Sequence, residues 1–262
     1  MRPTLQAGPS ARGQEPTGRP GRLRVVSPEA WNEIVARTRP GEVPEPWALW
    51  PALALLAIVL VWPQARRWGR TLVTIVHEAG HAAVGILVGR RFHGFVVGRD
   101  LSGHAVTSGR TRGAGRVLTT WAGYPAPAVL GALVALGAMR GWAGLILVLC
   151  LLLLAVLLVM SRSPRTAFLV ILVGIAAGLL WWWGGPWRDG LVAGTGLILL
   201  VGAWDSLRDV ARSRDGGQDH RTLAQLTPVP AGLWLATWFL ADAAATAAVL
   251  LALRPILGPL AP

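Results

Sequence analysis

The chain has 262 residues, of which 53% are apolar and 15% are charged. A soluble domain usually carries about 25% charged residues, so this composition excludes an ordinary soluble enzyme. The single cysteine, Cys150, excludes a scaffold held by internal disulfides. All 25 basic residues are arginine, and the net charge is +12, but the arginines are scattered between apolar runs and form no basic face for nucleic acid. Several uncharged runs reach the length that crosses a bilayer as a helix, so the sequence predicts an all-α polytopic membrane protein.

The first 46 residues form an N-terminal segment of different composition. Residues 1–26 are rich in Pro, Gly and Arg and are predicted to be a disordered basic tail. Ser27, Pro28 and Glu29 are typical of a helix start, so residues 28–38 are predicted to form a short helix. Three alternatives stay open for this segment: a helix that lies on the membrane surface through Trp31, a helix that docks on the rest of the chain, or no helix. Residues 47–262 are predicted to form the membrane domain.

The membrane domain is predicted to contain six to seven spanning helices with a short β-hairpin after the second. The seven apolar stretches are 47–63, 71–88, 115–138, 142–160, 166–183, 190–208 and 230–253. The hairpin is expected at residues 92–108, where short β-prone runs alternate with turn residues. Trp181, Trp182 and Trp183 are interpreted as part of an interfacial aromatic belt at the outer surface.

Arginine placement predicts the orientation of the spans. Most arginines lie in the N-terminal segment, in residues 89–116, in residues 161–165 and in residues 208–229, which are therefore assigned to the cytoplasmic side. Arg140 and the loops near Arg66, Arg188 and Arg254 are assigned to the opposite side. A multi-pass protein of the cell membrane with a cytoplasmic N-terminus follows from this assignment.

The chemistry-bearing motif lies inside the second predicted span and reads His77-Glu78-Ala79-Gly80-His81. Two histidines four residues apart project from one helix face and can both coordinate one Zn²⁺. The Glu78 carboxylate lies beside such a metal without ligating it and can act as a general base. Ionisable groups are costly in the middle of a span, which favours a functional interpretation over a packing one.

These residues resemble the site-2 protease clan of intramembrane zinc metalloproteases, peptidase family M50, and most closely the M50B-like group of actinobacterial membrane proteins. The Gly123-Tyr124-Pro125 stretch is similar to that group, and Asp219 with the following residues 223–227 resembles its C-terminal pattern. The resemblance covers about residues 70–253. It implies Zn²⁺, a third ligand that is an Asp from a later span, and a hairpin that holds an extended substrate.

The third ligand is predicted to be Asp209, and three more aspartates stay open as candidates. The second and sixth predicted spans run in the same direction, so their later residues share one half of the membrane. Depth favours Asp205, and the resemblance favours Asp209. Asp219 would have to fold back from a loop, and Asp242 lies on an oppositely directed helix.

The predicted function is hydrolysis of peptide bonds in or near transmembrane segments of other membrane proteins. The partners are therefore a transmembrane protein substrate and the lipid bilayer, without nucleic acid. Two further classes stay open: a non-proteolytic membrane protein that keeps the zinc site for structure or partner binding, and a metal or proton transporter.

Overall fold

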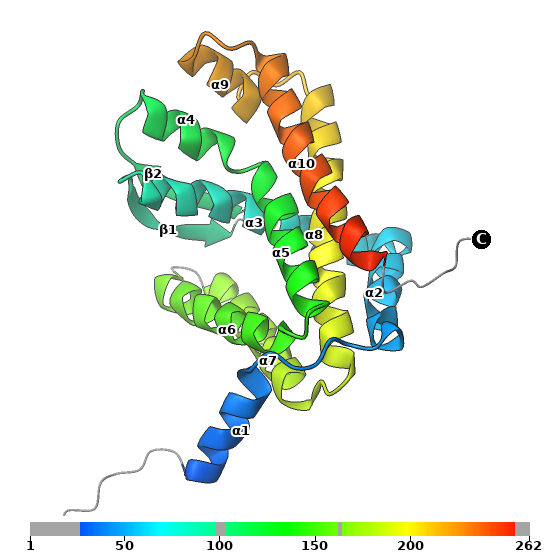
Figure 1. Cartoon of the computed structure of the whole chain (residues 1–262). Coiled ribbons are helices and arrows are strands. Elements are labelled where there is room, and N and C mark those ends of the chain that lie inside the picture. The colour runs from blue at the N-terminus through cyan, green and yellow to red at the C-terminus, as the bar shows by residue number, and fades with distance from the viewer. Residues whose placement is uncertain (1–26, 98–102, 162–163, 255–262) are drawn as a thin grey trace, which may run out of the picture.

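The computed structural model describes residues 27–97, 103–161 and 164–254, and the tail predicted at 1–26 lies outside these ranges. The elements, in chain order, are α1 (Pro28–Thr38), η1 (Pro46–Leu49), α2 (Trp50–Val61), α3 (Pro63–Leu87), β1 (Arg91–Val97), β2 (Gly103–Ser108), α4 (Ala114–Trp121), α5 (Pro125–Ala138), α6 (Ala143–Met160), α7 (Pro164–Trp183), α8 (Trp187–Arg212), α9 (Asp219–Leu226) and α10 (Ala231–Leu253). Apart from one two-stranded sheet, the fold is that of an all-α membrane protein. Helices α5, α8 and α10 lie side by side at its centre (Figure 1).

Small residues let the central helices approach closely. A side chain at Gly131 of α5 would lie 2.6 Å from the Gly196 carbonyl oxygen of α8, and a side chain at Gly196 would lie 2.6 Å from the Gly131 carbonyl oxygen. On another side of α8, a Cβ atom at Gly194 would lie 2.9 Å from the Ala52 Cα atom of α2. In a membrane helix, such close backbone contact supplies packing that lipid cannot replace.

Two pairs of consecutive helices meet at sharp bends, one between the first and second predicted spans and one inside the third. α2 and α3 meet at an angle of 104°, at the break between Trp62 and Pro63, and α4 and α5 meet at 59°, at the break before Pro125. A proline lacks the backbone N–H that would continue the preceding helix, and its ring clashes with the previous turn. Each break therefore coincides with the residue type that least tolerates a continuous helix.

The number of spans differs from the prediction. Among the described residues, two helices, α8 and α10, are long and apolar enough to cross a bilayer, and the number rises to four if each bent pair counts as one span. The apolar segments Ala143–Val159 of α6 and Ala167–Trp183 of α7 are shorter and are not among these spans. Six to seven spans are thus not supported, because continuous apolar sequence does not reveal where a helix bends or stops.

Two strands form in the segment where the sequence predicts a hairpin. β1 and β2 pair antiparallel, with Arg91 opposite Ser108 and Val97 opposite Gly103, and a register irregularity lies between Phe92 and Gly94. The residues between the strands, 98–102, are outside the described ranges. β2 packs along α3, so the sheet lies next to the helix that carries the histidine pair.

The N-terminal helix α1 forms over the predicted residues. The Ser27 side chain accepts a hydrogen bond from the Ala30 backbone N–H at 3.2 Å, and Pro28 occupies the first turn. At the other end of α1, the Arg37 guanidinium donates to the Trp182 carbonyl oxygen and stacks over the Trp182 ring, 4.5 Å from its centroid. The helix is thus docked on the chain through its last turn.

These contacts correct the predicted arrangement of loops. The Gly41 N–H donates to the Gly141 carbonyl oxygen at 2.9 Å, and Arg188 donates to the Arg37 carbonyl oxygen at 3.2 Å. The segment after α1 therefore lies at the same end as Arg140 and Arg188, which the arginine count assigns to the opposite side of the membrane. The predicted relative placement of these segments is wrong, because η1 packs beside the N-terminal end of α8, where a Cβ atom at Gly190 would overlap the Ala48 carbonyl oxygen. Which side faces the cytoplasm stays a prediction.

Candidate metal centre

The two histidines of the HExxH motif face each other on α3. They lie one helical turn apart, with 3.1 Å between the Nε2 atoms of His77 and His81 and 4.7 Å between their ring centroids. Side chains four residues apart on a helix are neighbours on one face. The sequence prediction that both imidazoles converge is confirmed by these distances.

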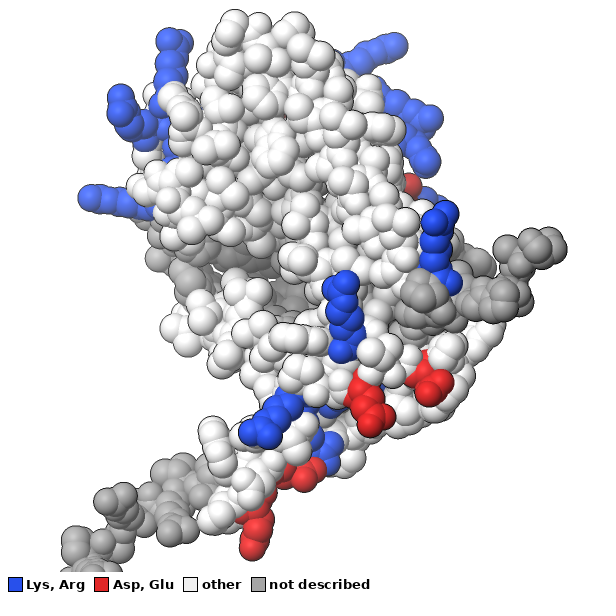
Figure 2. Space-filling view, viewed as in Figure 1, with Lys and Arg blue, Asp and Glu red and all other residues white. Residues whose placement is uncertain are grey.

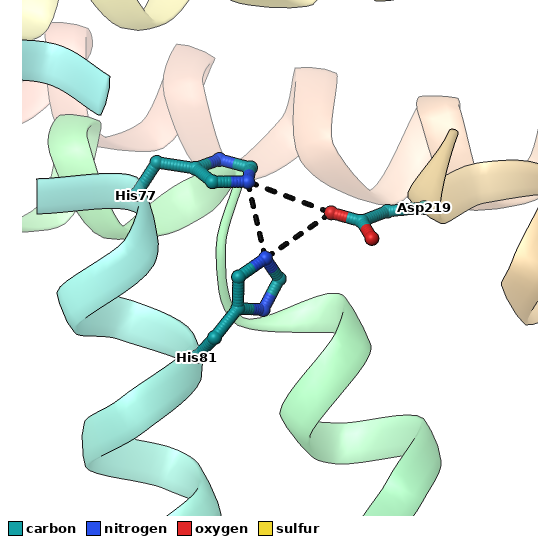
Figure 3. A group of neighbouring side chains, drawn as sticks. All are labelled: His77, His81 and Asp219. Carbon is teal, nitrogen blue, oxygen red and sulfur yellow. Dashed lines mark hydrogen bonds and ion pairs between the residues drawn. The ribbon is translucent and has the colours of Figure 1, made fainter. Parts of the chain in front are cut away.

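Asp219, the first residue of α9, completes the group. Its Oδ2 atom lies 3.2 Å from His81 Nε2 and 3.5 Å from His77 Nε2 (Figure 3). The ligand atoms of these three side chains all lie within 4.8 Å of one another, which is close enough to hold a metal. Among the described residues, no other cluster of three or more His, Cys, Asp or Glu side chains meets this condition. The loop after α8 brings α9 back against α4 and α10, so Asp219 reaches the histidines from a segment far along the chain (Figure 1).

The predicted third ligand, Asp209, does not join the histidines. It forms an ion pair with Arg70 of α3, and its side chain is 53% exposed. Asp209 also lines a neighbouring cavity of about 350 Å³, together with Tyr124 and Gln218. The family resemblance favoured Asp209, but its side chain pairs with Arg70 and not with the histidines.

Asp205 and Asp242 also lie apart from the histidine pair. Asp205 contacts Arg66 and Arg208, both at 3.4 Å. Asp242 is buried in α10, with 1% of its surface exposed, and does not belong to the metal-holding group. The resemblance of residues 219–227 to the family's C-terminal pattern was the sequence signal for Asp219. The expectation that it lies on a loop obscured this signal, because Asp219 starts a short helix.

The charge of Asp219 is stabilised by its neighbours. Burial favours the neutral carboxyl group, but hydrogen bonds to His77 and His81 and the charges of their imidazoles outweigh this effect and hold the pKa of Asp219 well below its usual range. The carboxylate is therefore ionised at neutral pH, as a metal ligand must be.

A backbone carbonyl group sets the tautomer of His81. The His81 Nδ1 atom lies 2.7 Å from the Thr119 carbonyl oxygen of α4. Because a carbonyl oxygen only accepts, Nδ1 carries a hydrogen, so Nε2 is the ring nitrogen that faces His77 and Asp219 and that could bind a metal. Metal-binding histidines in proteins are commonly oriented by such a contact at their second ring nitrogen.

Tyr124 holds the other side of the site, at the break between α4 and α5. Its ring contacts His77 edge to face, with 4.6 Å between centroids, and stacks on Trp238 at 4.3 Å. Its hydroxyl donates to the Gln218 side-chain oxygen at 3.2 Å, next to Asp219. Tyr124 thus contacts both the ring of His77 and Gln218, the residue that precedes Asp219.

Glycine at two positions makes room for the imidazoles. A Cβ atom at Gly123 would overlap the His81 ring and would lie 2.8 Å from His77 Cε1. On α3, a Cβ atom at Gly80 would lie 2.8 Å from the Ala122 carbonyl oxygen. The Gly123-Tyr124-Pro125 stretch therefore packs directly around the histidine pair, for which a larger residue at 123 would leave no space.

A polar cavity opens on the site. It has a volume of about 250 Å³ and is lined by His77, Glu78, His81, Arg116, Thr119, Thr120 and Asp219. Glu78 therefore shares the cavity with the three residues of the group without belonging to it, as the motif predicts. Arg116 of α4 brings a guanidinium to the same space.

The group fits a tetrahedral Zn²⁺ site. Zinc bonds to nitrogen and carboxylate oxygen are about 2.0–2.2 Å long, which places neighbouring ligand atoms about 3.3–3.6 Å apart in a tetrahedron. The three separations in the group are 3.1, 3.2 and 3.5 Å. Three protein ligands leave a fourth position open, as in catalytic zinc sites.

The fold and the site define a helical membrane protein with an HExxH group, joined by a distant aspartate, that could hold a metal. The Peptidase M50B-like family model matches residues 51–249, and the chain belongs to that family. This match supports the assignment to the site-2 protease (M50) family made from the motifs. No curated protein and no solved structure matches the chain.

Proposed function

We propose that the chain is a multi-pass intramembrane zinc metallopeptidase that hydrolyses peptide bonds in or near transmembrane segments of other membrane proteins. The observation that carries the proposal is the convergence of His77, His81 and Asp219 at separations that suit Zn²⁺, in a cavity that also contains Glu78. Membership of a peptidase family supports the reaction class. The apolar helices support a substrate that is itself a membrane protein.

His77, His81 and Asp219 would hold the metal. Bound there, Zn²⁺ would lower the pKa of a water molecule and polarise the substrate carbonyl group. Glu78 would take the proton from the attacking water and return it to the nitrogen of the leaving amine. Thr119, through its carbonyl oxygen, keeps the His81 ring in the tautomer that ligation requires.

Arg116 would act on the substrate. Its guanidinium lines the same cavity as Glu78 and carries a permanent positive charge. Hydrolysis of an amide develops negative charge on the carbonyl oxygen, and a preorganised cation beside that oxygen stabilises this charge. We assign Arg116 this role.

The two-stranded sheet would present the substrate. β2 packs along α3, so a peptide added to an edge of the sheet would lie close to the cavity. Strand addition also requires the substrate to be extended, which exposes its backbone to hydrolysis.

The test compares wild-type chain with Glu78→Gln, in cells from which the native copy is deleted. New protein N-termini are mapped in the membrane fraction, and zinc is quantified by elemental analysis on the purified proteins. We expect Glu78→Gln to keep its zinc and to lose every cleavage that maps to a transmembrane segment. Glu33→Gln on the exposed surface of α1 is the matched control and should cleave as wild type does.

Three results would overturn the proposal. Cleavage by Glu78→Gln at the wild-type rate would exclude the hydrolase function. Full zinc with no cleavage by the wild-type chain would favour a structural zinc site, and weak, readily exchanged zinc would favour a transporter.

A further inference from the structure

Exposed tryptophans gather at one end of the molecule. Six of them lie on segments that meet at the N-terminal end of α8, and their exposed fractions range from 37% for Trp182 to 71% for Trp183. We call this set the tryptophan girdle; its members are Trp47, Trp50, Trp142, Trp182, Trp183 and Trp187.

Contacts between these segments bring the tryptophans to the same level. Trp47 and Trp187 touch edge to face, with 6.1 Å between ring centroids. Arg37 joins the girdle through Trp182, and its carbonyl oxygen accepts from Arg188. The carbonyl oxygen of Gly141, next to Trp142, accepts from the N–H of Gly41. The girdle is therefore one continuous feature built from separate parts of the chain.

Exposed tryptophan is costly in water and disfavoured in the middle of a bilayer. Its indole N–H and its large apolar ring together suit the headgroup region, where one part is wet and the other apolar. The run Trp181–Trp183 alone is weak evidence for such a belt, but a girdle assembled by tertiary contacts is much stronger.

A second level, formed by the ion pairs Arg66–Asp205 and Arg70–Asp209, lies about one hydrocarbon thickness from the girdle along α8. At a rise of about 1.5 Å per residue, α8 extends about 33 Å from Trp187 to Asp209, and the hydrocarbon core of a bilayer is about 30 Å thick. Residues 190–204 of α8 carry no charge, and the charges return at Asp205 and Asp209, which pair with Arg66 and Arg70.

The second level has the same chemical character as the first. Trp62 and Trp68 are both more than half exposed, and they flank Arg66 in sequence. Arginine and tryptophan together are the residues that anchor a membrane protein at an interface. The three residues that could hold a metal, His77, His81 and Asp219, are called the metal group below. This group lies at the second level, because Asp209 lines a cavity together with Gln218, and Gln218 directly precedes Asp219.

The surface charge agrees with two separated levels. On the face seen in Figure 2, a broad area without charged side chains has arginines at its upper margins, and acidic and basic side chains mix at the lower end around α1. The described glutamates near the girdle, at positions 29, 33, 42 and 45, all belong to this end, in or just after α1.

We propose that the tryptophan girdle seats the chain in the headgroup region of one leaflet of a phospholipid bilayer, and that the Arg66–Asp205 and Arg70–Asp209 level marks the opposite interface. The partner of this surface is the lipid bilayer itself. The metal group then lies close to the interface opposite to the girdle, and α1 lies on the girdle side, at the level of the headgroups or in water.

Depth measurement with spin labels tests the proposal independently of any catalytic activity. Single cysteines are introduced in a Cys150→Ala background, labelled with a nitroxide and reconstituted in phosphatidylcholine vesicles. The collision rates with oxygen and with a water-soluble nickel chelate then report depth. The labelled positions are Trp50 and Trp183 in the girdle, Leu133 on α5, Arg212 at the end of α8, and Glu33 on α1.

We expect the girdle labels to report the headgroup depth. Leu133, near the close contact of Gly131 with Gly196 in the middle of α8, should be at least about 10-fold less accessible to nickel than Trp50 and Trp183, because the chelate is excluded from hydrocarbon. Arg212 should report the opposite interface, and Glu33 should be open to water. Trp47→Cys is a further girdle position if Trp50→Cys does not reach the membrane fraction.

Girdle labels as shielded as Leu133 would place the tryptophans inside the hydrocarbon layer and overturn the proposal. Girdle labels as open to nickel as Glu33, with no collisions with lipid-dissolved oxygen, would place them in water and overturn it equally.

Discussion

The Tyr124 hydroxyl donates a hydrogen bond to the Gln218 side-chain oxygen at 3.2 Å, and this bond joins the α4–α5 break to the start of α9. The same ring contacts His77, so one residue positions two parts of the metal group that are more than a hundred residues apart. The Gly-Tyr-Pro stretch of the sequence thus gains a physical role: it shapes the metal group although it supplies no ligand.

This role predicts graded effects of substitution at Tyr124. Tyr124→Ala removes both the ring contact and the hydrogen bond, and we expect it to weaken zinc binding by about 10–100-fold, as loss of an outer contact usually does. Tyr124→Phe keeps the ring on His77 and Trp238 and should lose only about threefold, within the range of one lost neutral hydrogen bond. Competition with a zinc chelator on purified protein measures both. Phe239→Ala, an exposed aromatic truncation on α10, is the control.

The third ligand can be tested by single substitutions of aspartate. We expect Asp219→Ala to abolish stoichiometric zinc binding, because it removes one of the three ligand atoms and the only carboxylate of the group. Asp209→Ala should keep full zinc, since Asp209 pairs with Arg70 on an exposed surface, where an ion pair contributes at most about 1 kcal/mol to stability. Elemental analysis decides, and full zinc in Asp219→Ala with loss in Asp209→Ala would restore the ligand predicted from sequence.

Glycine at position 123 should be indispensable for the metal group. The added methyl group of Gly123→Ala would overlap the His81 ring, so one imidazole must leave its place. We expect zinc to be lost while the helical content is kept. Gly174→Ala on α7 is the matched control, because an added Cβ atom there meets nothing within 4 Å. Circular dichroism and zinc content measured on the same samples separate a local effect from unfolding.

Arg116 should affect catalysis without affecting the metal. Arg116→Gln removes the cation from the cavity but changes no ligand, and loss of one such group typically lowers kcat by about 10²–10³-fold. The measurement is the initial rate of cleavage of a substrate found in the terminus-mapping experiment, with zinc content as the second readout. Arg112→Gln, just before α4 and exposed, should cleave at the wild-type rate. An equal loss in both variants would mean that Arg116 contributes only net charge.

The sequence alone determined the local half of the metal group. His77, Glu78 and His81 lie within five residues, and the helical repeat places them because it acts between neighbours in the chain. The same local rules predicted α1 and its Ser27 cap, and the strand-prone segment after α3. Composition was sufficient for the class of membrane protein, because a bilayer constrains the apolar content of every helix that crosses it.

Only the tertiary structure decided which aspartate joins the histidines. Asp219 reaches them because the buried Leu223 of α9 packs with Trp238 of α10 in one apolar cluster and so holds α9 over α4. The arginine count likewise failed for the N-terminal segment, since the Gly41–Gly141 contact joins residues a hundred positions apart. Periodicity and charge report what each segment prefers by itself, but the pairing of distant segments depends on side-chain packing, for which a single sequence carries no repeating signal.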